Sequence, residues 1–276
     1  MTINCKGALI DLSEPKIMGV LNITPDSFFD GGKYKDEKSV LSQVEKMLDE
    51  GASFIDVGAY SSRPGANAIS KEEELQRILP IIQLLIKEFP QAVVSIDTFR
   101  SEVAIKCLEA GAALVNDISA GKLDENMLST IAQYKVPYIM MHMKGTPFSM
   151  QQKTEYQDLL TDILYYFSER VMAARALGIH DIIVDPGFGF AKTLEQNYSL
   201  LQQLELFQNL DLPLLVGLSR KSMIYKTLEI TAERALNGTT ALNMVALTKG
   251  ANILRVHDVK EAVECVKLYS SLMNCS

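Results

Sequence analysis

The sequence predicts a single-domain α/β protein over residues 1–276, a (β/α)8 barrel of the TIM type. Short apolar runs alternate with amphipathic helical patterns from one end of the chain to the other. The runs are apolar almost throughout rather than alternating, which is typical of parallel strands covered on both faces. A length of 276 residues is ordinary for eight strand–helix units. The alternative is an open doubly wound sheet.

The expected strands follow one another at intervals that leave room for a helix between them. They are residues 17–21, 54–57, 92–96, 113–116, 138–141, 182–184, 214–217 and 252–256. Residues 1–12 come before the first strand and could form a small hairpin across the bottom of the barrel.

The segments between these strands carry apolar residues at helical spacing. One stripe runs from Leu75 to Ile86, and Ser70 with Glu73 ahead of it predicts an N-terminal capping box. Some glycines each close a helical stretch shortly before a strand, and we expect a positive φ there because glycine adopts it readily. They are Gly51, Gly111, Gly178 and Gly250.

Composition and charge exclude several classes of protein. The net charge of −7 and the pI of about 5.1 argue against a broad nucleic-acid-binding surface. No apolar stretch is long enough to cross a bilayer, and no secretory signal peptide is visible. The four cysteines are not spaced as a metal or redox site, so we expect reduced thiols in a cytoplasmic protein.

Polar residues gather at the ends of the expected strands. In a parallel barrel the carboxyl ends of the strands share one face, where the active sites of this architecture lie. We therefore expect these side chains to converge, although strand ends also carry ordinary caps and turns. They are Asn22, Ser61, Ser62, Arg63, Asp97, Asn116, Asp117, His142, Lys144, Asp185, Ser219, Arg220, Lys221, Arg255 and His257.

These residue types point to a polar heterocycle that carries a phosphorylated group. The sequence contains no P-loop, no zinc-protease motif and no nucleophile elbow. The Asn22 oxygen could ligate Mg²⁺ shared with phosphates, because Mg²⁺ often takes few protein ligands. One set of donors suits phosphate oxygens: Asn22, Ser61, Ser62, Arg63, Arg255 and His257. A second set suits the amide and amino edge of a heterocycle: Asp97, Asn116, Asp185 and Lys221.

Eight segments of the chain, in the same order, resemble dihydropteroate synthases, and together they reach over nearly its whole length. They are Leu21-Asn-Ile-Thr-Pro-Asp-Ser-Phe28 followed by Asp30-Gly-Gly, Ser61-Ser-Arg-Pro-Gly-Ala66, Ser95-Ile-Asp-Thr98, Asn116-Asp-Ile118, Met141-His-Met-Lys-Gly145, Asp185-Pro-Gly-Phe-Gly-Phe190, Gly217-Leu-Ser-Arg-Lys221 and Arg255-Val-His-Asp258.

The resemblance implies a transferase of folate biosynthesis that moves a pterin-methyl group. It would condense 6-hydroxymethyl-7,8-dihydropterin diphosphate with 4-aminobenzoate, assisted by Mg²⁺, and release 7,8-dihydropteroate and pyrophosphate. Sulfonamides would compete with 4-aminobenzoate. The implied catalytic residues are Asp97, Asp185, Lys221 and Arg255.

The resemblance also assigns side chains to each ligand. The pterin would contact Asp97, Asn116, Met141, Asp185, Lys221 and Arg255. The diphosphate would contact Asn22, Ser62, Arg63, Arg255 and His257, with Asn22 at the metal. The 4-aminobenzoate would contact Phe28, Ser62, Pro64, Phe190, Ser219 and Lys221.

The chain departs from the family pattern at two positions. Ser62 stands where the family usually has threonine, so the hydroxyl is kept and a methyl group is lost. Ala191 stands where the family often has glycine, which limits backbone freedom there.

In the loop after residue 22, either Phe28 or Phe29 could be the ring that closes over the substrates. We expect Phe28 to act on the aminobenzoate side.

Two other functions share part of this pattern. A pterin-binding methyltransferase domain of the corrinoid-linked type would have the barrel and the pterin aspartates, without needing the diphosphate set. A non-catalytic pterin-binding protein would also keep the pocket.

The resemblance further implies a homodimer formed through helices near the C-terminus. A stripe there fits either that interface or the core: Ala262, Val263, Val266, Tyr269 and Leu272.

Overall fold

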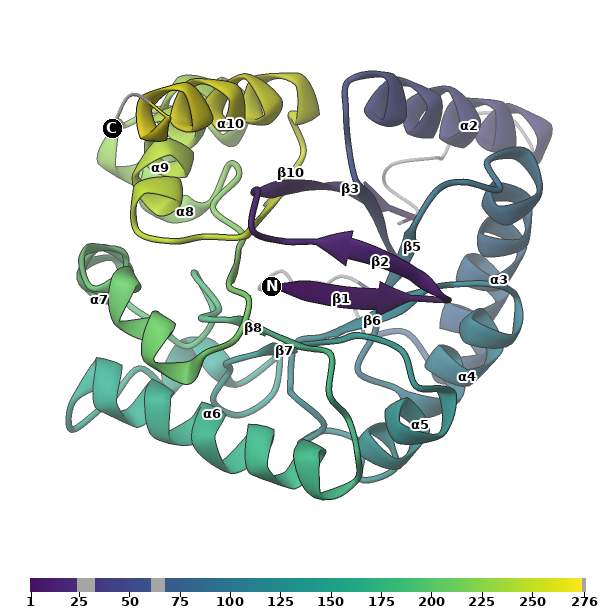
Figure 1. Cartoon of the computed structure of the whole chain (residues 1–276), viewed down its shortest axis with the longest axis horizontal. Helices are drawn as coiled ribbons and strands as arrows, with labels where there is room; N and C mark the ends of the chain where they lie inside the picture. Colours follow the sequence, from purple (N-terminus) through teal and green to yellow (C-terminus); the bar gives the residue numbers. More distant parts are fainter. Residues whose placement is uncertain (24–32, 61–67, 275–276) are drawn as a thin grey trace.

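A nearly closed barrel of eight parallel strands forms the centre of the molecule, as a computed structural model shows (Figure 1). The structure describes residues 1–23, 33–60 and 68–274, with the backbone alone at 33–36. The strands are β3 (Lys16–Asn22), β4 (Phe54–Gly58), β5 (Val94–Asp97), β6 (Leu114–Asp117), β7 (Tyr138–Met141), β8 (Ile182–Asp185), β9 (Leu215–Val216) and β10 (Ile253–Val256).

Neighbouring strands pair in the order β8-β7-β6-β5-β4-β3-β10-β9, so the first strand of the barrel pairs with the last, and the consecutive strands β8 and β9 lie at the two ends of the sheet. A parallel bridge between Val184 and Leu214 brings the two ends of this sheet together. The amide of Val184 also donates to the carbonyl of Pro213 at 2.9 Å. The sheet therefore curls back on itself, which confirms the predicted barrel and rules out the open doubly wound alternative.

Helices surround the barrel as an outer ring (Figure 1). Their apolar faces pack on the outward side chains of the strands and form the largest core cluster. The α-helices are α2 (Lys33–Asp49), α3 (Lys71–Glu88), α4 (Ser101–Glu109), α5 (Met127–Tyr134), α6 (Leu159–Ala176), α7 (Leu194–Gln202), α8 (Ser222–Thr227), α9 (Leu236–Thr248) and α10 (Val259–Met273). Short 3-10 helices are η1 (Met150–Gln152), η2 (Leu204–Leu210) and η3 (Ala232–Arg234).

The helix ends follow the local sequence. Ser70 accepts a hydrogen bond from the amide of Glu73 at 3.1 Å, which confirms the serine as the cap of α3. Positive φ angles occur at each of the glycines that the sequence placed at a helix end: +103° at Gly51, +117° at Gly111, +80° at Gly178 and +94° at Gly250. These glycines turn the chain from a helix toward the next strand.

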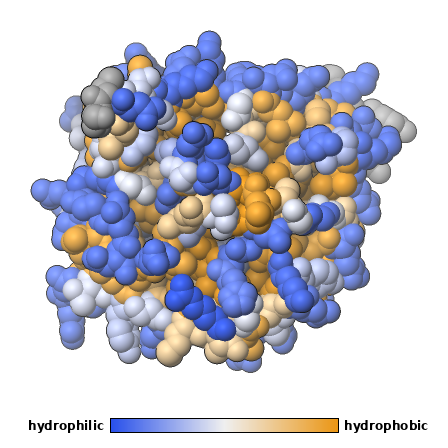
Figure 2. All heavy atoms as spheres, in the orientation of Figure 1, coloured by the Kyte–Doolittle hydropathy of each residue, from blue (hydrophilic) through white to orange (hydrophobic). Residues whose placement is uncertain are grey.

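An antiparallel hairpin, β1 (Thr2–Cys5) and β2 (Ala8–Asp11), lies across the bottom of the barrel (Figure 1). Lys6 and Gly7 form its turn with φ of +54° and +90°, the combination that a tight two-residue hairpin needs. Ile3, Cys5 and Leu12 pack on the lowest inward side chains of the barrel, including Phe54. Figure 2 shows the same face, with hydrophilic residues around its margin and hydrophobic ones nearer its middle.

The C-terminal helix α10 contributes mainly to the core. Ala262 is buried, and Val263, Val266 and Tyr269 pack against the main cluster. Leu272 belongs to the same stripe but is 62% exposed, and the neighbouring Leu268 is 65% exposed. Among the described residues, no helix combines the length and the hydrophobicity that a membrane span requires.

Candidate active site

The upper layer of the barrel interior is polar, whereas the lower layer is apolar. Side chains two residues apart on a strand face the same way, so each strand presents one residue to each layer. Phe54 and Ile253 lie in the lower layer, and Asp56 and Arg255, two residues further on, lie above them. The residues that alternation places in the upper layer are Asn22, Asp56, Asp97, Asn116, Met141, Asp185, Gly217 and Arg255.

Arg255 joins two carboxylates from neighbouring strands. Its Nε donates to Oδ2 of Asp56 at 2.6 Å, and its Nη2 donates to Oδ2 of Asp97 at 2.7 Å. Asn116 donates from Nδ2 to the same oxygen of Asp56 at 2.9 Å. The guanidinium is therefore fixed by two charge-assisted hydrogen bonds.

Burial and charge set the protonation of this cluster. Burial raises the pKa of Asp97 to about 7, although the positive charge of Arg255 opposes the rise. Burial alone would lower the pKa of Arg255, but Asp56 and Asp97 raise it above its ordinary value. Oδ1 of Asp56 is buried and has no hydrogen-bonding partner within the described residues. An unsatisfied buried carboxylate oxygen that lies against this cluster is ready to accept a donor from a ligand.

Asp185 and Lys221 form the second charged pair of the mouth. Burial raises the pKa of Asp185, and the charge of Lys221 opposes the rise. Burial lowers the pKa of Lys221 to about 8, and Asp185 acts in the opposite direction. The Lys221 ammonium donates to the Phe188 carbonyl and lies 5.1 Å from the centre of the Phe190 ring. Gly217 lies next to this pair, and a β-carbon on it would be 3.9 Å from the Lys221 nitrogen, an ordinary van der Waals distance.

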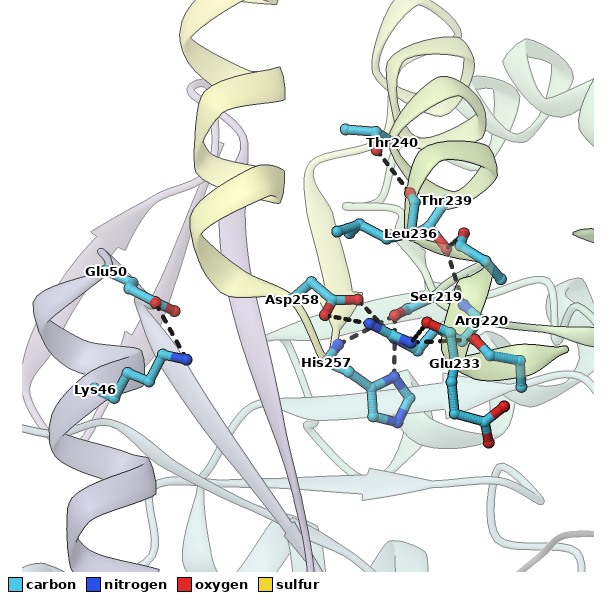
Figure 3. A network of polar contacts seen from close by, with 12 residues as sticks. Lys46, Glu50, Ser219, Arg220, Glu233, Leu236, Thr239, Thr240, His257 and Asp258 are labelled. Carbon is cyan, nitrogen blue, oxygen red and sulfur yellow. Dashed lines mark hydrogen bonds and ion pairs between the residues drawn. The ribbon is translucent and has the colours of Figure 1, made fainter.

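Ser219 and His257 meet beside the ion pair of Arg220 and Asp258 (Figure 3). The Ser219 hydroxyl and Nδ1 of His257 are 3.0 Å apart, and the His257 amide donates to the same hydroxyl at 3.2 Å. Arg220 binds both oxygens of Asp258 at 2.8 Å and has a φ of +55°. Arg220 therefore braces the loop that holds Ser219 and Lys221, and its side chain is not free for a ligand.

The loop after β8 is held by a buried lysine. Lys192 is 4% exposed, and its ammonium lies 3.1 Å from Nδ1 of His142. It also donates to the carbonyls of Gly187 at 2.9 Å and Phe190 at 3.0 Å. Burial lowers the pKa of Lys192 to about 7.

Some of the strand-end residues do not converge on the mouth, and that expectation was wrong for them. Asp117 follows Asn116 directly and faces outward, where it accepts a 2.6 Å hydrogen bond from Tyr138. His142 follows Met141 directly and packs against the ring of Tyr166 at 4.9 Å. Consecutive residues on a strand point to opposite sides, so only one member of each pair can face the interior. Lys144 likewise donates to the Glu155 carbonyl and lies over the Tyr156 ring, away from the cluster.

Asp56 is the member of the cluster that sequence reasoning missed. It lies inside Phe54-Ile-Asp-Val57, a segment read only as an apolar strand. A charged residue in a strand covered on both faces should itself be a signal, because a buried carboxylate needs a partner. Lys192 was also missed; it follows a recognised motif but lies two residues beyond its end.

Several sequence-predicted site residues lie outside the described part of the chain. They are Phe28, Phe29, Ser61, Ser62, Arg63 and Pro64. Of the others, Met141 is buried beside Ala191 and Met143 in a small cluster that Phe190 also contacts. Ala191 itself adopts a φ of +50°, a conformation that favours glycine.

The described residues contain no group of three or more His, Cys, Asp or Glu side chains that could hold a metal ion. The mouth instead offers the amide oxygen of Asn22, a half-buried residue at the end of β3. A single neutral oxygen fits an ion that takes its other ligands from a bound phosphate and water, as Mg²⁺ does. It does not fit an ion held by protein alone.

Comparisons with known proteins agree with this geometry. A family model described as pterin binding enzyme matches residues 18–257. Dihydropteroate synthase of Escherichia coli (strain K12) is 40% identical over 99% of this chain and 97% of its own length. The structure of the Yersinia pestis dihydropteroate synthase in a sulfonamide drug complex aligns with a TM-score of 0.93, at 40% identity, over 99% of this chain and 100% of that one.

A further structure, the Xanthomonas albilineans dihydropteroate synthase with 4-aminobenzoic acid, has a TM-score of 0.91 at 35% identity and covers 99% of this chain and 98% of its own. These relatives are dihydropteroate synthases rather than corrinoid-linked methyltransferases. With the barrel, the order of the motifs and the charged mouth in agreement, the chain belongs to the dihydropteroate synthases, the pterin-binding enzymes of folate biosynthesis.

Proposed function

We propose that the barrel mouth condenses 6-hydroxymethyl-7,8-dihydropterin diphosphate with 4-aminobenzoate to give 7,8-dihydropteroate and pyrophosphate. The observation that carries this proposal is the arrangement around Arg255, whose guanidinium links Asp56 and Asp97 while Asp185 and Lys221 complete the mouth. Carboxylates suit the donors of a pterin edge, and cations suit a diphosphate.

The pterin lies, in this proposal, among the side chains of the inner upper layer. Asp185 and Asp97 accept hydrogen bonds from the ring's N–H groups, and Asn116 supplies an amide to its polar edge. The unsatisfied Oδ1 of Asp56 offers a further acceptor. Arg255 stands against the ring and reaches toward the diphosphate. Lys221 and Met141 complete the contacts assigned to the heterocycle.

The diphosphate lies at the outer rim of the mouth. His257 is exposed there and is oriented by Ser219, so its ring can donate to a phosphate oxygen. Ser62, Arg63 and Arg255 complete the set assigned to the diphosphate. Asn22 would hold the Mg²⁺ ion, which, when bound, offsets the negative charge of the leaving group.

The 4-aminobenzoate lies beside the loop after β8. The half-buried ring of Phe190 and the ammonium of Lys221 form one wall, and Ser219 is close to the same lysine in the chain. Phe28, Ser62 and Pro64 are assigned to the opposite side. Sulfonamides resemble this substrate in shape and charge, so we expect them to compete for the same wall.

Positioning and electrostatics account for the reaction. The C–O bond between the pterin methylene and the diphosphate breaks, and its electron pair leaves with the diphosphate. The amine nitrogen of 4-aminobenzoate forms the new C–N bond and then loses a proton to solvent. Asp97 and Asp185, when ionised, stabilise positive charge on the pterin. Because a neutral arylamine is already nucleophilic, the site needs no nucleophile–base pair.

The proposal is tested by mixing the purified protein with both substrates and Mg²⁺. We expect pyrophosphate release that depends on 4-aminobenzoate, and loss of that release when Asp185 is replaced by Asn. A protein that binds the pterin diphosphate but releases no pyrophosphate on addition of 4-aminobenzoate would be a pterin-binding protein without this activity.

The chain is proposed to act as a cytoplasmic homodimer. The buried, unpaired thiols of Cys5, Cys107 and Cys265 support a reducing compartment. The exposed apolar side chains of Leu268 and Leu272 on α10 support a partner surface at that helix. Sedimentation measures the mass of the wild type and of the double variant Leu268→Glu, Leu272→Glu. A dimeric wild type and a monomeric variant are expected, and a monomeric wild type would contradict the proposal.

A further inference from the structure

The loop of residues 186–191 has no regular hydrogen-bonding ladder, and side chains from elsewhere satisfy its backbone. Each carbonyl from Gly187 to Ala191 accepts a bond from a side chain. The donors are Lys192 to Gly187 and Phe190, Lys221 to Phe188, Gln151 to Gly189, and Tyr156 to Ala191. Buried or half-buried carbonyls need such partners, so the donors determine where this loop lies.

Lys192 is the donor that makes two of these bonds. Its ammonium has three N–H groups and three acceptors, which are Nδ1 of His142 and the carbonyls of Gly187 and Phe190. Nδ1 of His142 can accept only when it carries no proton, so the imidazole is neutral with its proton on Nε2. Burial and the nearby charge of Lys192 lower the pKa of His142 well below its ordinary value, which agrees with this state.

The backbone of the loop would not hold this shape unaided. Gly187, Gly189 and Ala191 have φ of +72°, +81° and +50°. A β-carbon on Gly187 would collide with the His142 carbonyl oxygen, so the loop is pressed onto β7. The left-handed conformation is unfavourable for Ala191, and the two glycines can adopt many others, so bonds from other side chains are needed to select this one.

The loop connects Lys192 to the substrate side of the mouth. Lys192 holds the carbonyl of Phe190, and the Phe190 ring lies 5.1 Å from the Lys221 ammonium. Lys221 in turn donates to the carbonyl of Phe188 in the same loop. A shift of the loop would therefore move the ring and the carbonyl that orients Lys221 together.

We propose that Lys192 is a positioning residue for the 4-aminobenzoate side of the site: its ammonium fixes loop 186–191, which sets the Phe190 ring and the carbonyl that orients Lys221. Lys192 does not touch the substrates. This inference rests on the proposed assignment of Phe190 and Lys221 to 4-aminobenzoate. The hydrogen bonds that join Asp56, Asp97, Asn116 and Arg255 do not involve the loop.

The inference predicts an unequal effect on the two substrates. Lys192→Met keeps the length of the side chain and removes its three donors. We expect the KM for 4-aminobenzoate to rise about tenfold or more, because small displacements of positioning groups have large kinetic effects. The KM for the pterin diphosphate should rise less. Lys221 and Asp185, which accepts from the Gly187 amide, also contact the pterin, but the hydrogen bonds among Asp56, Asp97, Asn116 and Arg255 do not involve the loop. A variant that was merely less folded would lower the apparent kcat and leave both KM values unchanged.

Lys122→Met is the matched control. Lys122 carries its ammonium 4.4 Å from the centre of the Tyr166 ring in the same region, but it makes no bond to loop 186–191. We expect its KM values to stay within about twofold of the wild type. An equal rise in both KM values in Lys192→Met, or no rise for 4-aminobenzoate, would overturn the inference.

Two further variants keep the test decisive if Lys192→Met does not fold. Tyr156→Phe removes only the bond to the Ala191 carbonyl, and we expect a rise of about threefold in the KM for 4-aminobenzoate, the scale of one neutral hydrogen bond. Phe190→Ala tests the site assignment itself. If Phe190→Ala has no effect on that KM, the proposed site fails; if it has an effect but Lys192→Met and Tyr156→Phe have none, the positioning role fails.

Discussion

Replacing Arg255 with alanine should destabilise the protein by an amount that depends on pH. The substitution removes two charge-assisted hydrogen bonds, of 2.6 Å to Asp56 and 2.7 Å to Asp97. It leaves Asp56, whose side chain is fully buried, beside Asp97 without the cation that joins them. Removing one partner from a buried ion pair typically costs about 3–5 kcal/mol of unfolding free energy, and we expect that loss at pH 8.

The sign of the pH dependence follows from the protonation of Asp97. Its pKa is raised to about 7 even with Arg255 present, and the loss of the positive charge must raise it further. A carboxyl group whose pKa is higher in the folded than in the unfolded state binds more protons when folded. Stability then falls as pH rises, by about 1.4 kcal/mol per pH unit between the unfolded pKa and the folded pKa. The unfolding free energy that Arg255→Ala loses relative to the wild type should therefore be smaller at pH 6 than at pH 8.

Urea unfolding of the wild type and the variant at pH 6, 7 and 8 measures this difference. Arg77→Ala is the control, because Arg77 pairs with the half-exposed Glu73 within α3 and should cost less than about 1 kcal/mol. The same preparations should show turnover lowered by about two orders of magnitude or more in Arg255→Ala. A deficit that is the same at pH 6 and pH 8, or no larger than that of Arg77→Ala, would refute the reasoning, and so would wild-type turnover.

Three other perturbations have defined outcomes. The rate profile kcat/KM should fall below about pH 7, where Asp97 gains a proton, and at higher pH, where Lys192 (pKa about 7) and Lys221 (pKa about 8) lose theirs. Lys221→Met should remove the limb at about pH 8, and a flat profile would contradict these roles. Gly187→Ala should lower the unfolding free energy by about 1–3 kcal/mol from backbone strain, with more from the collision with the His142 carbonyl, and an unchanged melting temperature would show that the loop yields freely. Phe28→Gly should raise the KM for 4-aminobenzoate, whereas unchanged kinetics would exclude Phe28 as the closing ring.

The barrel was predictable because its strands are apolar on both faces. The expected segment 138–141 coincides with β7, and 54–57 differs from β4 only by the terminal Gly58. Segment 214–217 was less accurate, since only Leu215 and Val216 pair as β9. The sequence shows the apolar pattern of the side chains, whereas a strand is defined by its backbone hydrogen bonds. The bounds of short strands at the closing edge of the barrel are therefore the hardest to predict.

The site was only partly predictable. The sequence located the strand ends, but it did not show which of two consecutive side chains there faces the barrel interior. Asn116 and Asp117 both end β6, but only Asn116 faces the interior. Asp56 was hidden inside an apolar run, although its burial and its pairing with Arg255 make it central to the cluster. The role of Lys192 could not be predicted from the sequence, because its hydrogen-bonding partners are His142, far away in the chain, and the carbonyls of an irregular loop.

The central claim is that the pterin binds inside the barrel mouth rather than elsewhere on the molecule. A crystal structure with 6-hydroxymethyl-7,8-dihydropterin diphosphate bound tests it most directly. We predict the heterocycle within hydrogen-bonding distance of Asp97, Asn116 and Asp185, with its diphosphate toward His257. The structure offers a different cavity of about 300 Å³, lined by Lys122 and other residues beside α6. A pterin bound there, with the barrel mouth empty, would contradict the account.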